Sequence, residues 1–370
     1  MTTAVPSLLS TLAQVPDFRS KQGRRYELSS ILTLVCLSLV CGATSRTAIA
    51  EWSHRHASSL FLKNSPSVST IRRVLAGIDQ NKLEEVLCQW LEEALAAHPY
   101  PKTLLEPFSI DGKKVRGSGK KAEEQVHLLS VYSQRLGIIL CQHALSSGQT
   151  EAQAVVVMLK EMMCAGRVFT FDAGFTYRSV AQVIVQRQGH YFMTVKGNQE
   201  TLYRTIERAF QWGNIDVKHV PNYTGEAVVH GREERRTVFV LPAPENCWVA
   251  AQQIIKIVRW RKNKRTGVET RMTAYAITSI PKERATPMYL HHLCRDHWGI
   301  ENCVHYVRDV AWREDHSTIK NRQEVAVMAL LRNAVLSVLR LQDVQCITSK
   351  LRYYAIHSED ALACIGVSKR

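Results

Sequence analysis

The chain lacks the cysteine patterns that mark a zinc site. Its ten cysteines are spread along the sequence, with no CxxC pair and no Cys/His cluster at zinc-ligand spacing. A structural zinc module is therefore excluded. Several cysteines, such as Cys36 and Cys141, lie in apolar runs. We expect them to be buried free thiols in a reducing cytoplasm.

Long apolar runs are missing as well. The most apolar stretch, residues 31–40, is too short to span a bilayer, and the residues before it lack the layout of a signal peptide. The sequence also contains no internal repeat and no low-complexity tract. These absences predict a cytoplasmic protein that has no membrane partner.

Acidic residues are in deficit. The 370 residues include 33 Asp and Glu against 48 Lys and Arg, which gives a formal net charge of +15. This excess favours a polyanionic partner, although charge alone does not separate nucleic acid from an anionic membrane surface. Basic residues are dense at 19–25, 113–121, 232–236 and 259–265. Such a spread suits a long groove better than a single docking tail.

The hydrophobic pattern changes along the chain. A hydrophobic content of 45% indicates a packed globular protein. Residues 1–100 show helical periodicity throughout and predict an all-helical domain, which is a candidate for DNA binding. Residues 101–212 alternate between strands and helices, which predicts a mixed α/β sheet. Residues 213–282 read as a β-rich insertion, and residues 283–370 return to helices that complete the core.

Three acidic residues, far apart in sequence, have features of one metal site. Asp111 and Asp172 each follow an apolar run that reads as a strand, and Glu301 lies in a segment that reads as a helix. Carboxylates arranged in this way can hold a pair of Mg²⁺ ions, which is the arrangement that cleaves and rejoins phosphodiesters. In so basic a chain, the expected phosphodiester is DNA.

Each carboxylate also has a simpler interpretation. Asp111 and Gly112 fit an ordinary turn. Asp172 could cap a helix, although it lies too far upstream of the helix expected at 178–187. Glu301 could belong to a surface stripe of ion pairs with its helical neighbours. Three further carboxylates compete with it for the role of third ligand: Asp309, Glu314 and Asp315.

Polar and basic residues near these carboxylates are candidate DNA contacts. Three basic residues lie close to Asp111, and three residues at 196–199 follow a predicted strand end. Two arginines lie one or two helical turns from Glu301, where they could bind phosphates. An aromatic residue in the basic loop 259–265 could insert into the duplex and hold a flipped base, although a solvated hairpin is the alternative. The candidates are Lys113, Lys114, Arg116, Lys196, Asn198, Gln199, Arg232, Trp260, Arg295 and Arg308.

Several motifs, taken in order, give the whole chain a family resemblance. It resembles the H-repeat-associated DDE transposases of bacterial insertion sequences. The motifs that carry the resemblance are Asp17…Arg19…Gly23-Arg24-Arg25-Tyr26, Asp111-Gly112-Lys113…Arg116-Gly117-Ser118, Lys196-Gly197-Asn198-Gln199, Gly231-Arg232…Glu234…Arg236, His297-Trp298-Gly299-Ile300-Glu301-Asn302 and Leu351-Arg352-Tyr353-Tyr354.

This resemblance implies an RNase H-like catalytic core with a β-rich insertion before its last catalytic helix. It implies cleavage and strand transfer at element ends, with two Mg²⁺ ions, or Mn²⁺ in their place, held by Asp111, Asp172 and Glu301. The expected partners are double-stranded DNA, as terminal repeats and as target, and a second copy of the chain in a synaptic homodimer. The expected location is the nucleoid. Residues that would orient the glutamate are His297, Trp298 and His305.

The chain departs from the family pattern at one place. Members usually carry a His and a Gln shortly after the second aspartate, whereas Phe175 and Tyr177 stand here. Three hypotheses therefore remain: a transposase, a structure-specific Mg²⁺-dependent nuclease, and a decayed remnant that only binds DNA. The three intact carboxylates argue against the remnant, and the transposase is the leading hypothesis.

Overall fold

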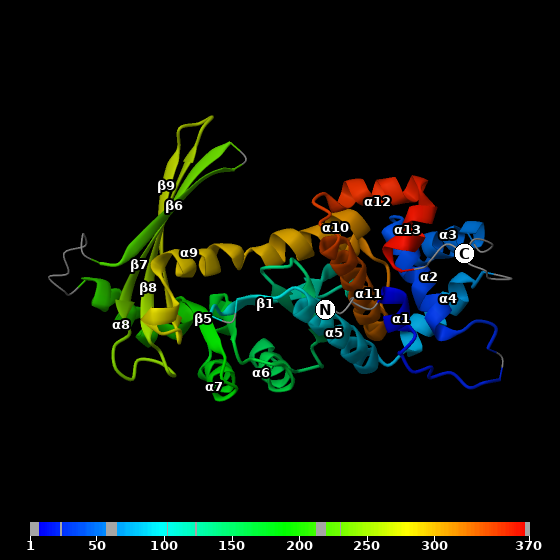
Figure 1. Cartoon of the computed structure of the whole chain (residues 1–370), viewed down its shortest axis with the longest axis horizontal. Helices are drawn as coiled ribbons and strands as arrows, with labels where there is room; N and C mark the ends of the chain where they lie inside the picture. The colour runs from blue at the N-terminus through cyan, green and yellow to red at the C-terminus, as the bar shows by residue number, and fades with distance from the viewer. Residues whose placement is uncertain are drawn as a thin grey trace. The chain divides into compact units, whose positions relative to one another are not determined.

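The computed structural model describes residues 7–22, 24–56, 65–101, 103–122, 124–211, 220–229 and 231–366. Gly23 and residues 213–219 of the predicted insertion lie outside them. The chain forms two compact units, which Figure 1 shows coloured by residue number. Unit 1 comprises Met1–Pro99, Gly112–Ser147 and Ile300–Arg370, and unit 2 comprises Tyr100–Asp111 and Gly148–Gly299. The four-segment division expected from the sequence stays a prediction.

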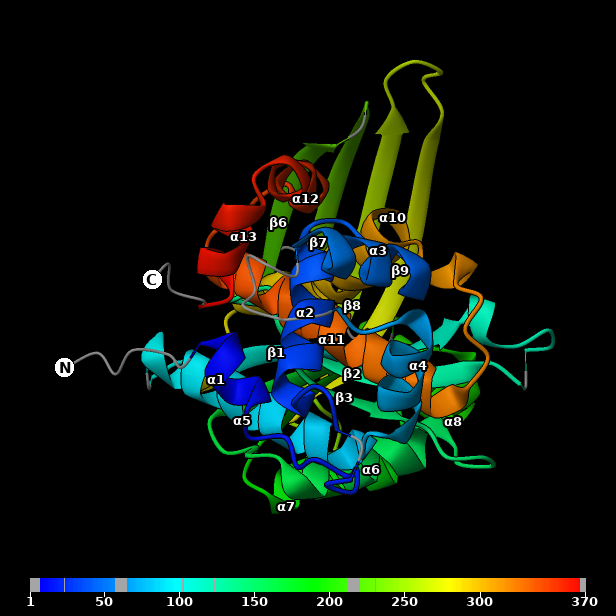
Figure 2. The same cartoon turned by 90° about the vertical axis from the view of Figure 1, so that its right-hand side faces the viewer.

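Unit 1 is mainly helical. Its longest helix is α11 (Arg322–Leu341), which is largely buried and contacts α2 (Leu28–Val40), α4 (Val68–Gly77) and α5 (Gln80–Ala97) (Figure 2). Side-chain caps begin three of these helices: Asn321 accepts from the Glu324 amide, Ser67 accepts from the Thr70 amide, and Asp79 accepts from the amides of the first turn of α5. The other helices are α1 (Leu8–Leu12), α3 (Arg46–His56), α10 (Tyr306–Trp312), α12 (Ile347–Ile356) and α13 (Ser358–Cys364).

Unit 1 also contains two β-strands. Strands β2 (Val126–Ser133) and β3 (Ile139–Ala144) pair antiparallel, and α5 packs on β3. This packing brings Cys88 of α5 and Cys141 of β3 together as a disulfide. The expectation that all ten cysteines are free thiols is therefore wrong for this pair. The other eight, all within the described residues, are free.

Unit 2 is built on a mixed sheet. Residues Glu106–Ile110 of β1 (Glu106–Val115) run parallel to β4 (Arg167–Phe171), which runs parallel to β5 (His190–Val195). The sheet then continues antiparallel through β9 (Glu269–Thr278), β8 (Gln253–Asn263), β7 (Arg232–Pro242) and β6 (Asn222–Val229), which are the long strands of Figure 1. The predicted β-rich insertion is thus an extension of the sheet.

Four helices accompany this sheet: α6 (Glu151–Glu161), α7 (Arg178–Gln186), α8 (Glu200–Gln211) and α9 (Pro287–Asp296). Leu290 and Leu293 of α9 pack with inward residues of β7 and β8, such as Val238 and Ile255, in one hydrophobic cluster. The predicted α/β class, with helices first and a mixed sheet after them, is confirmed. No helix within the described ranges combines the length and apolar character needed to cross a bilayer.

Candidate active site

The two aspartates extend neighbouring parallel strands of unit 2. Ile110 of β1 is paired with Phe171 of β4, so Asp111 and Asp172 come next on adjacent strands at the same edge of this pairing. Asp111 does not end its strand, because β1 continues to Val115. The simpler interpretation of Asp111 as part of a turn is therefore wrong. Asp172 is exposed, and its Oδ1 accepts from the Gly174 amide at 2.8 Å.

The loop after Asp172 is held by two amide side chains. Asn198 donates to the carbonyl of Ala173 at 2.7 Å, and Gln199 donates to the carbonyl of Thr176 at 2.8 Å. The sequence suggested both residues as DNA contacts. The structure shows that their amide groups also hold the loop after Asp172, and a contact of either residue with DNA stays a prediction. Lys196, the third residue of that group, is exposed.

The two residues that depart from the family pattern have different environments. Phe175 is buried and packs against Phe171, with 6.2 Å between ring centroids. Tyr177 is 43% exposed. Phe175 therefore contributes to the core of unit 2 and offers no polar group beside Asp172.

Beyond α9, His297 is hydrogen-bonded to the strand that carries Asp172. Its Nδ1 lies 2.9 Å from Oγ1 of Thr170, which in turn donates to the carbonyl of Phe108 at 3.1 Å. Burial lowers the pKa of His297 to about 4, so the ring is neutral at pH 7. Trp298, which the sequence placed beside the site, is 57% exposed.

In unit 1, Glu301 begins a π-helical turn, Glu301–His305. Such turns are rare and occur frequently at functional sites. Glu301 Oε2 lies 3.0 Å from Nδ1 of His305, and this hydrogen bond lowers the pKa of the glutamate. The Glu301 side chain is 53% exposed, whereas that of His305 is 3% exposed. Glu301 is thus an ionised carboxylate, oriented by a buried imidazole and reachable from solvent.

The competing carboxylates of unit 1 are neutralised by cations. Asp309 lies 2.6 Å from the ammonium of Lys113, and Asp315 accepts from the backbone amide of Arg116 at 3.2 Å and lies 3.6 Å from its guanidinium. Glu314 is fully buried between Arg308 at 2.6 Å and Arg332 at 3.0 Å. This arrangement favours Glu301 as the carboxylate available for an external ligand.

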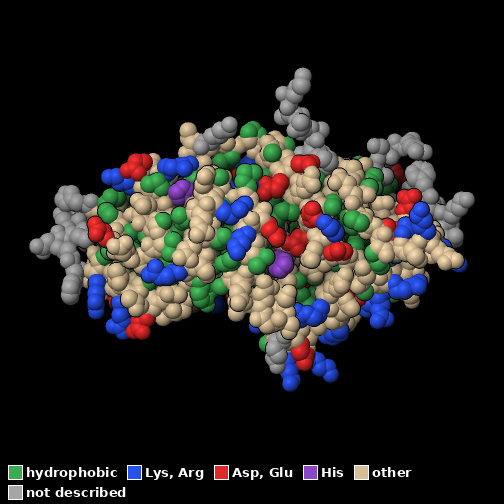
Figure 3. Space-filling view, turned by 90° about the horizontal axis from the view of Figure 1, so that it is seen from below, with side chains coloured by type: hydrophobic (Ala, Val, Ile, Leu, Met, Phe, Trp, Pro, Cys, Tyr) green, Lys and Arg blue, Asp and Glu red, His purple; other side chains and the backbone are tan. Residues whose placement is uncertain are grey.

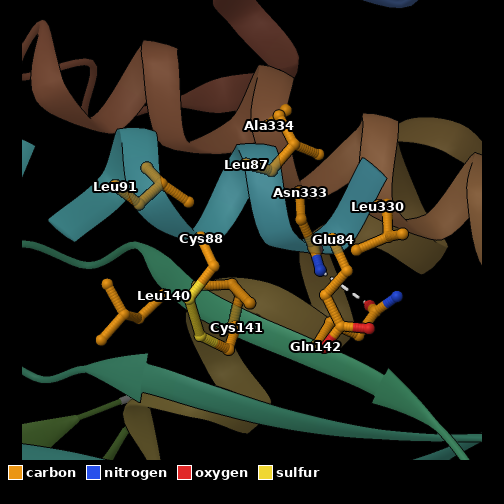
Figure 4. Close-up of a pocket in the computed structure, with 11 residues that line it drawn as sticks. Glu84, Leu87, Cys88, Leu91, Leu140, Cys141, Gln142, Leu330, Asn333 and Ala334 are labelled. Atoms are coloured by element: carbon orange, nitrogen blue, oxygen red, sulfur yellow. Dashed lines mark hydrogen bonds between the residues drawn. A yellow bond between two sulfur atoms is a disulfide. The ribbon is translucent and has the colours of Figure 1, made fainter. Parts of the chain in front are cut away.

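Burial opposes ionisation of Glu314, but the cations around it prevail. Arg308, Arg332 and Lys113 together hold the pKa of Glu314 at about 2, against an ordinary value of 4.5. Arg308 also donates to Gln142 at 3.1 Å and to Asn333 at 3.3 Å. Figure 4 shows the adjoining hydrogen bond from Asn333 to Gln142, beside the Cys88–Cys141 disulfide.

Two expected DNA contacts are therefore corrected. Arg308 has no exposed surface, and Lys113 is 8% exposed with its ammonium held by carboxylates and by the carbonyl of His305. Neither can reach a phosphate without breaking a buried ion pair. Lys114 and Arg116, in contrast, are exposed. The alternation along β1 turns Lys113 inward and Lys114 outward.

Trp260 lies within β8, before the basic turn that follows this strand. Its indole donates to Glu269 on β9 at 3.1 Å, and the Arg235 guanidinium lies 5.8 Å from its ring centroid. The remaining expected contacts, Arg232 and Arg295, line one cavity of unit 2. Figure 3 shows Lys and Arg dispersed among Asp and Glu over the face in view, without one continuous basic strip.

Comparisons with known proteins identify the family of the chain. Residues 101–338 match the family model described as Transposase DDE domain, and residues 9–91 match the one described as DDE_Tnp_1-associated. YncI of Escherichia coli O157:H7 is 28% identical over 354 residues, or 91% of this chain and 88% of its own. The H repeat-associated YhhI of Escherichia coli K12 is 23% identical over 350 residues, or 90% of each chain. Both names include the word transposase.

Among solved structures, the piggyBac transposase synaptic complex with hairpin DNA overlaps 98% of this chain and 77% of that chain. Its TM-score is 0.44 and its identity 10%, and a likeness at this level carries no argument.

Proposed function

Because the chain belongs to the Transposase DDE domain family, we propose that it cleaves DNA at insertion-sequence ends and joins those ends to target DNA. The observation that carries this proposal is the state of Glu301. It is ionised, half exposed and oriented by His305, while its rivals Asp309 and Glu314 are bound to cations. A general DNA-binding remnant would have no need for such a carboxylate.

The proposed ligands fit a hard divalent cation. Asp111, Asp172 and Glu301 offer carboxylate oxygens, the donors that Mg²⁺ prefers. A pair of Mg²⁺ ions, or Mn²⁺ in their place, would activate the attacking hydroxyl and stabilise the leaving oxygen. The chain's own contribution is to position these carboxylates and, through His305, to favour the ionised form of Glu301.

Contacts inside each unit hold the segments that carry the proposed ligands. In unit 1, Lys113, two residues after Asp111 on β1, donates to the carbonyl of His305 at 3.3 Å. In unit 2, His297 is bonded to Thr170, two residues before Asp172.

The neutral imidazole of His297 and the buried imidazole of His305 have different roles in this proposal. His305 donates its Nδ1–H to the ionised Glu301 carboxylate and fixes the rotamer of that side chain. His297 anchors the helix to β4 without adding charge. Of the DNA contacts suggested by the sequence, the exposed residues that remain candidates are Lys114, Arg116, Lys196, Asn198, Arg232 and Arg295. Double-stranded ends and target DNA, a synaptic homodimer and a nucleoid location complete the proposal.

The test is cleavage of a supercoiled plasmid that carries candidate element ends, with Mg²⁺ and then with EDTA. Glu301→Gln, Asp111→Asn and Asp172→Asn should each abolish cutting. Asp309→Asn is the matched control, because it removes a neighbouring carboxylate that Lys113 already neutralises. Cutting that ignores the element ends would instead indicate a structure-specific nuclease.

One observation favours a second candidate, the non-catalytic remnant. Phe175 puts a hydrocarbon ring where the family usually has a polar residue, three residues after Asp172. The same plasmid assay separates the two. DNA binding without metal-dependent cutting, equal in wild type and Glu301→Gln, would establish the remnant and refute the enzyme.

A further inference from the structure

One face of β7 changes from apolar to charged along its length. Val240 and Val238 point into the hydrophobic core of unit 2, and the next residues on that face are Arg236, Glu234 and Arg232. The neighbouring strand follows the same change, because Arg259 of β8 is opposite Arg236 and Arg261 is opposite Glu234. The core therefore continues directly into a cluster of arginines.

This cluster and α9 enclose a cavity of about 230 Å³. Four of the lining residues are arginines: Arg232, Arg236, Arg261 and Arg295. Glu226 also lines the cavity, but it is opposite Arg235 in the strand pairing, and its carboxylate is bound to Arg235 at 2.7 Å on the other face of the sheet. The lining carboxylate on the cavity face is that of Glu234. Four arginines minus one glutamate leave a formal charge of +3 around the cavity. Such an excess of positive charge favours an anion.

Glu234 has no capacity left to neutralise the cluster. Its Oε1 accepts from Arg236 at 2.8 Å, and its Oε2 accepts from Arg261 at 2.6 Å. Arg236 is 7% exposed, and its Nη1 is buried with no hydrogen-bond partner among the described residues. A buried donor without a partner is costly and is rare in folded proteins. Arg236 therefore presents an N–H group that an external acceptor would satisfy.

The opposite wall of the cavity contains a second unsatisfied group. His291 of α9 is 3% exposed, and its Nδ1 has no hydrogen-bond partner in the described part of the chain. Burial, with Arg236 nearby, lowers the pKa of His291 to about 4. The neutral ring can donate one N–H into the cavity. Its position depends on Gly225, where an added Cβ would lie 2.5 Å from the ring.

We infer that this cavity, the arginine pocket, binds a phosphate group of DNA. Guanidinium groups recognise phosphate oxygens with paired, charge-assisted hydrogen bonds, and a neutral imidazole adds one more donor. The pocket itself indicates a phosphate group. The assignment of that phosphate to DNA rests on the proposed function. Free phosphate and nucleotides have the same chemistry, so the test must separate these sources.

The first measurement is calorimetric titration of the whole chain with inorganic phosphate in EDTA. Arg236→Gln should weaken binding about 10- to 100-fold, as expected for the loss of a charged hydrogen bond. The matched control is Arg235→Gln, since Arg235 is the next residue of β7, on its opposite face, with a side chain 59% exposed. Equal losses in both variants, or no phosphate binding by wild type, would overturn the inference.

The second measurement uses duplex DNA without divalent metal. Arg236→Gln should reduce the slope of log Kd against log salt concentration by about 1, and Arg235→Gln should leave it unchanged. An unchanged slope for Arg236→Gln, despite lost phosphate binding, would overturn the assignment to DNA and indicate a free phosphate compound. If Arg236→Gln does not fold, Arg295→Gln replaces it, because Arg295 lies at the surface of the pocket.

Both measurements omit catalysis, so their outcome is independent of the plasmid assay. A chain that binds phosphate through Arg236 but never cuts DNA would refute only the proposed activity. A chain that cuts at element ends with an unchanged salt slope in Arg236→Gln would refute only the arginine pocket.

Discussion

The ammonium of Lys113 lies 2.6 Å from Oδ1 of Asp309, and both belong to unit 1. The same ammonium is 3.5 Å from Glu314 and donates to the carbonyl of His305. Lys113 thus links the buried arginine–glutamate network to the backbone of the turn that carries Glu301. Its neighbour Lys114 faces solvent.

Lys113→Met should therefore destabilise the protein strongly. Removing one partner of a buried ion pair typically costs about 3–5 kcal/mol, because the other charge stays buried. Lys114→Met should change the free energy of unfolding by no more than about 0.5 kcal/mol, as is usual at exposed sites. Urea unfolding followed by circular dichroism compares the two. Similar stabilities of the two variants would contradict the buried role of Lys113.

His305→Gln should impair catalysis while leaving the fold intact. Loss of a residue that orients a metal ligand typically costs about 10- to 100-fold in metal affinity or activity. Because the His305 hydrogen bond lowers the pKa of Glu301, the variant should also lose activity at a higher pH than wild type. Cleavage rates across Mg²⁺ concentration and pH measure both effects. A lower rate with an unchanged Mg²⁺ requirement and pH profile would argue against this role.

Glu314 makes stability depend on acid pH. Its folded pKa of about 2 lies below the ordinary value of 4.5, so folding releases a proton between these values. The stabilisation is fully present above pH 4.5 and is lost as the pH falls towards 2. Wild type should thus lose unfolding free energy more steeply than Glu314→Gln over this window. Parallel curves in acid denaturation would exclude the effect.

Gly225→Ala should distort the arginine pocket. The new Cβ would lie 2.5 Å from Cε1 of His291, so the ring or the strand must move. We expect a lower melting temperature together with weaker phosphate binding. Gly197→Ala is the control, because a Cβ there meets nothing within 4 Å. If both variants behave alike, Gly225 is not required by its contact with His291.

Thiol counting tests the disulfide. Denatured protein should show eight free thiols before reduction and ten after it. The bridge closes a 53-residue separation, for which chain entropy gives a stabilisation of about 4 kcal/mol. The double variant Cys88→Ala/Cys141→Ala should lose a comparable part of the unfolding free energy. Ten thiols without reduction would show that the pair is not bonded.

Much of the fold could be predicted because long periodic segments determine it. The apolar faces of α5 and α11 and the alternating strands of the insertion are local patterns, and the mixed α/β class and the transposase family are both confirmed. The roles of Asp111, Asp172 and Glu301 stay predictions, since the motif that suggested them fixes their identity but not their coordination.

The buried pairs could not be predicted, because sequence spacing does not reveal burial. In the sequence, Arg308 and Lys113 cannot be distinguished from cations on the surface. Only the folded chain shows that both lie beside the buried Glu314, which also binds Arg332. The one available signal was Arg332-Asn333 inside the otherwise apolar stretch of α11. Likewise, Cys88 and Cys141 became partners only through the packing of α5 on β3.

The shared face of β7 has a consequence for misfolding. A pairing slip of one residue would turn Val238 and Val240 out of the core at the same moment as it turned Arg236 and Glu234 away from the cavity. The apolar half of the strand therefore enforces the alignment of its charged half. Molecules with an intact core and a misaligned pocket should not accumulate, so loss of the pocket through slippage should always coincide with loss of the native fold.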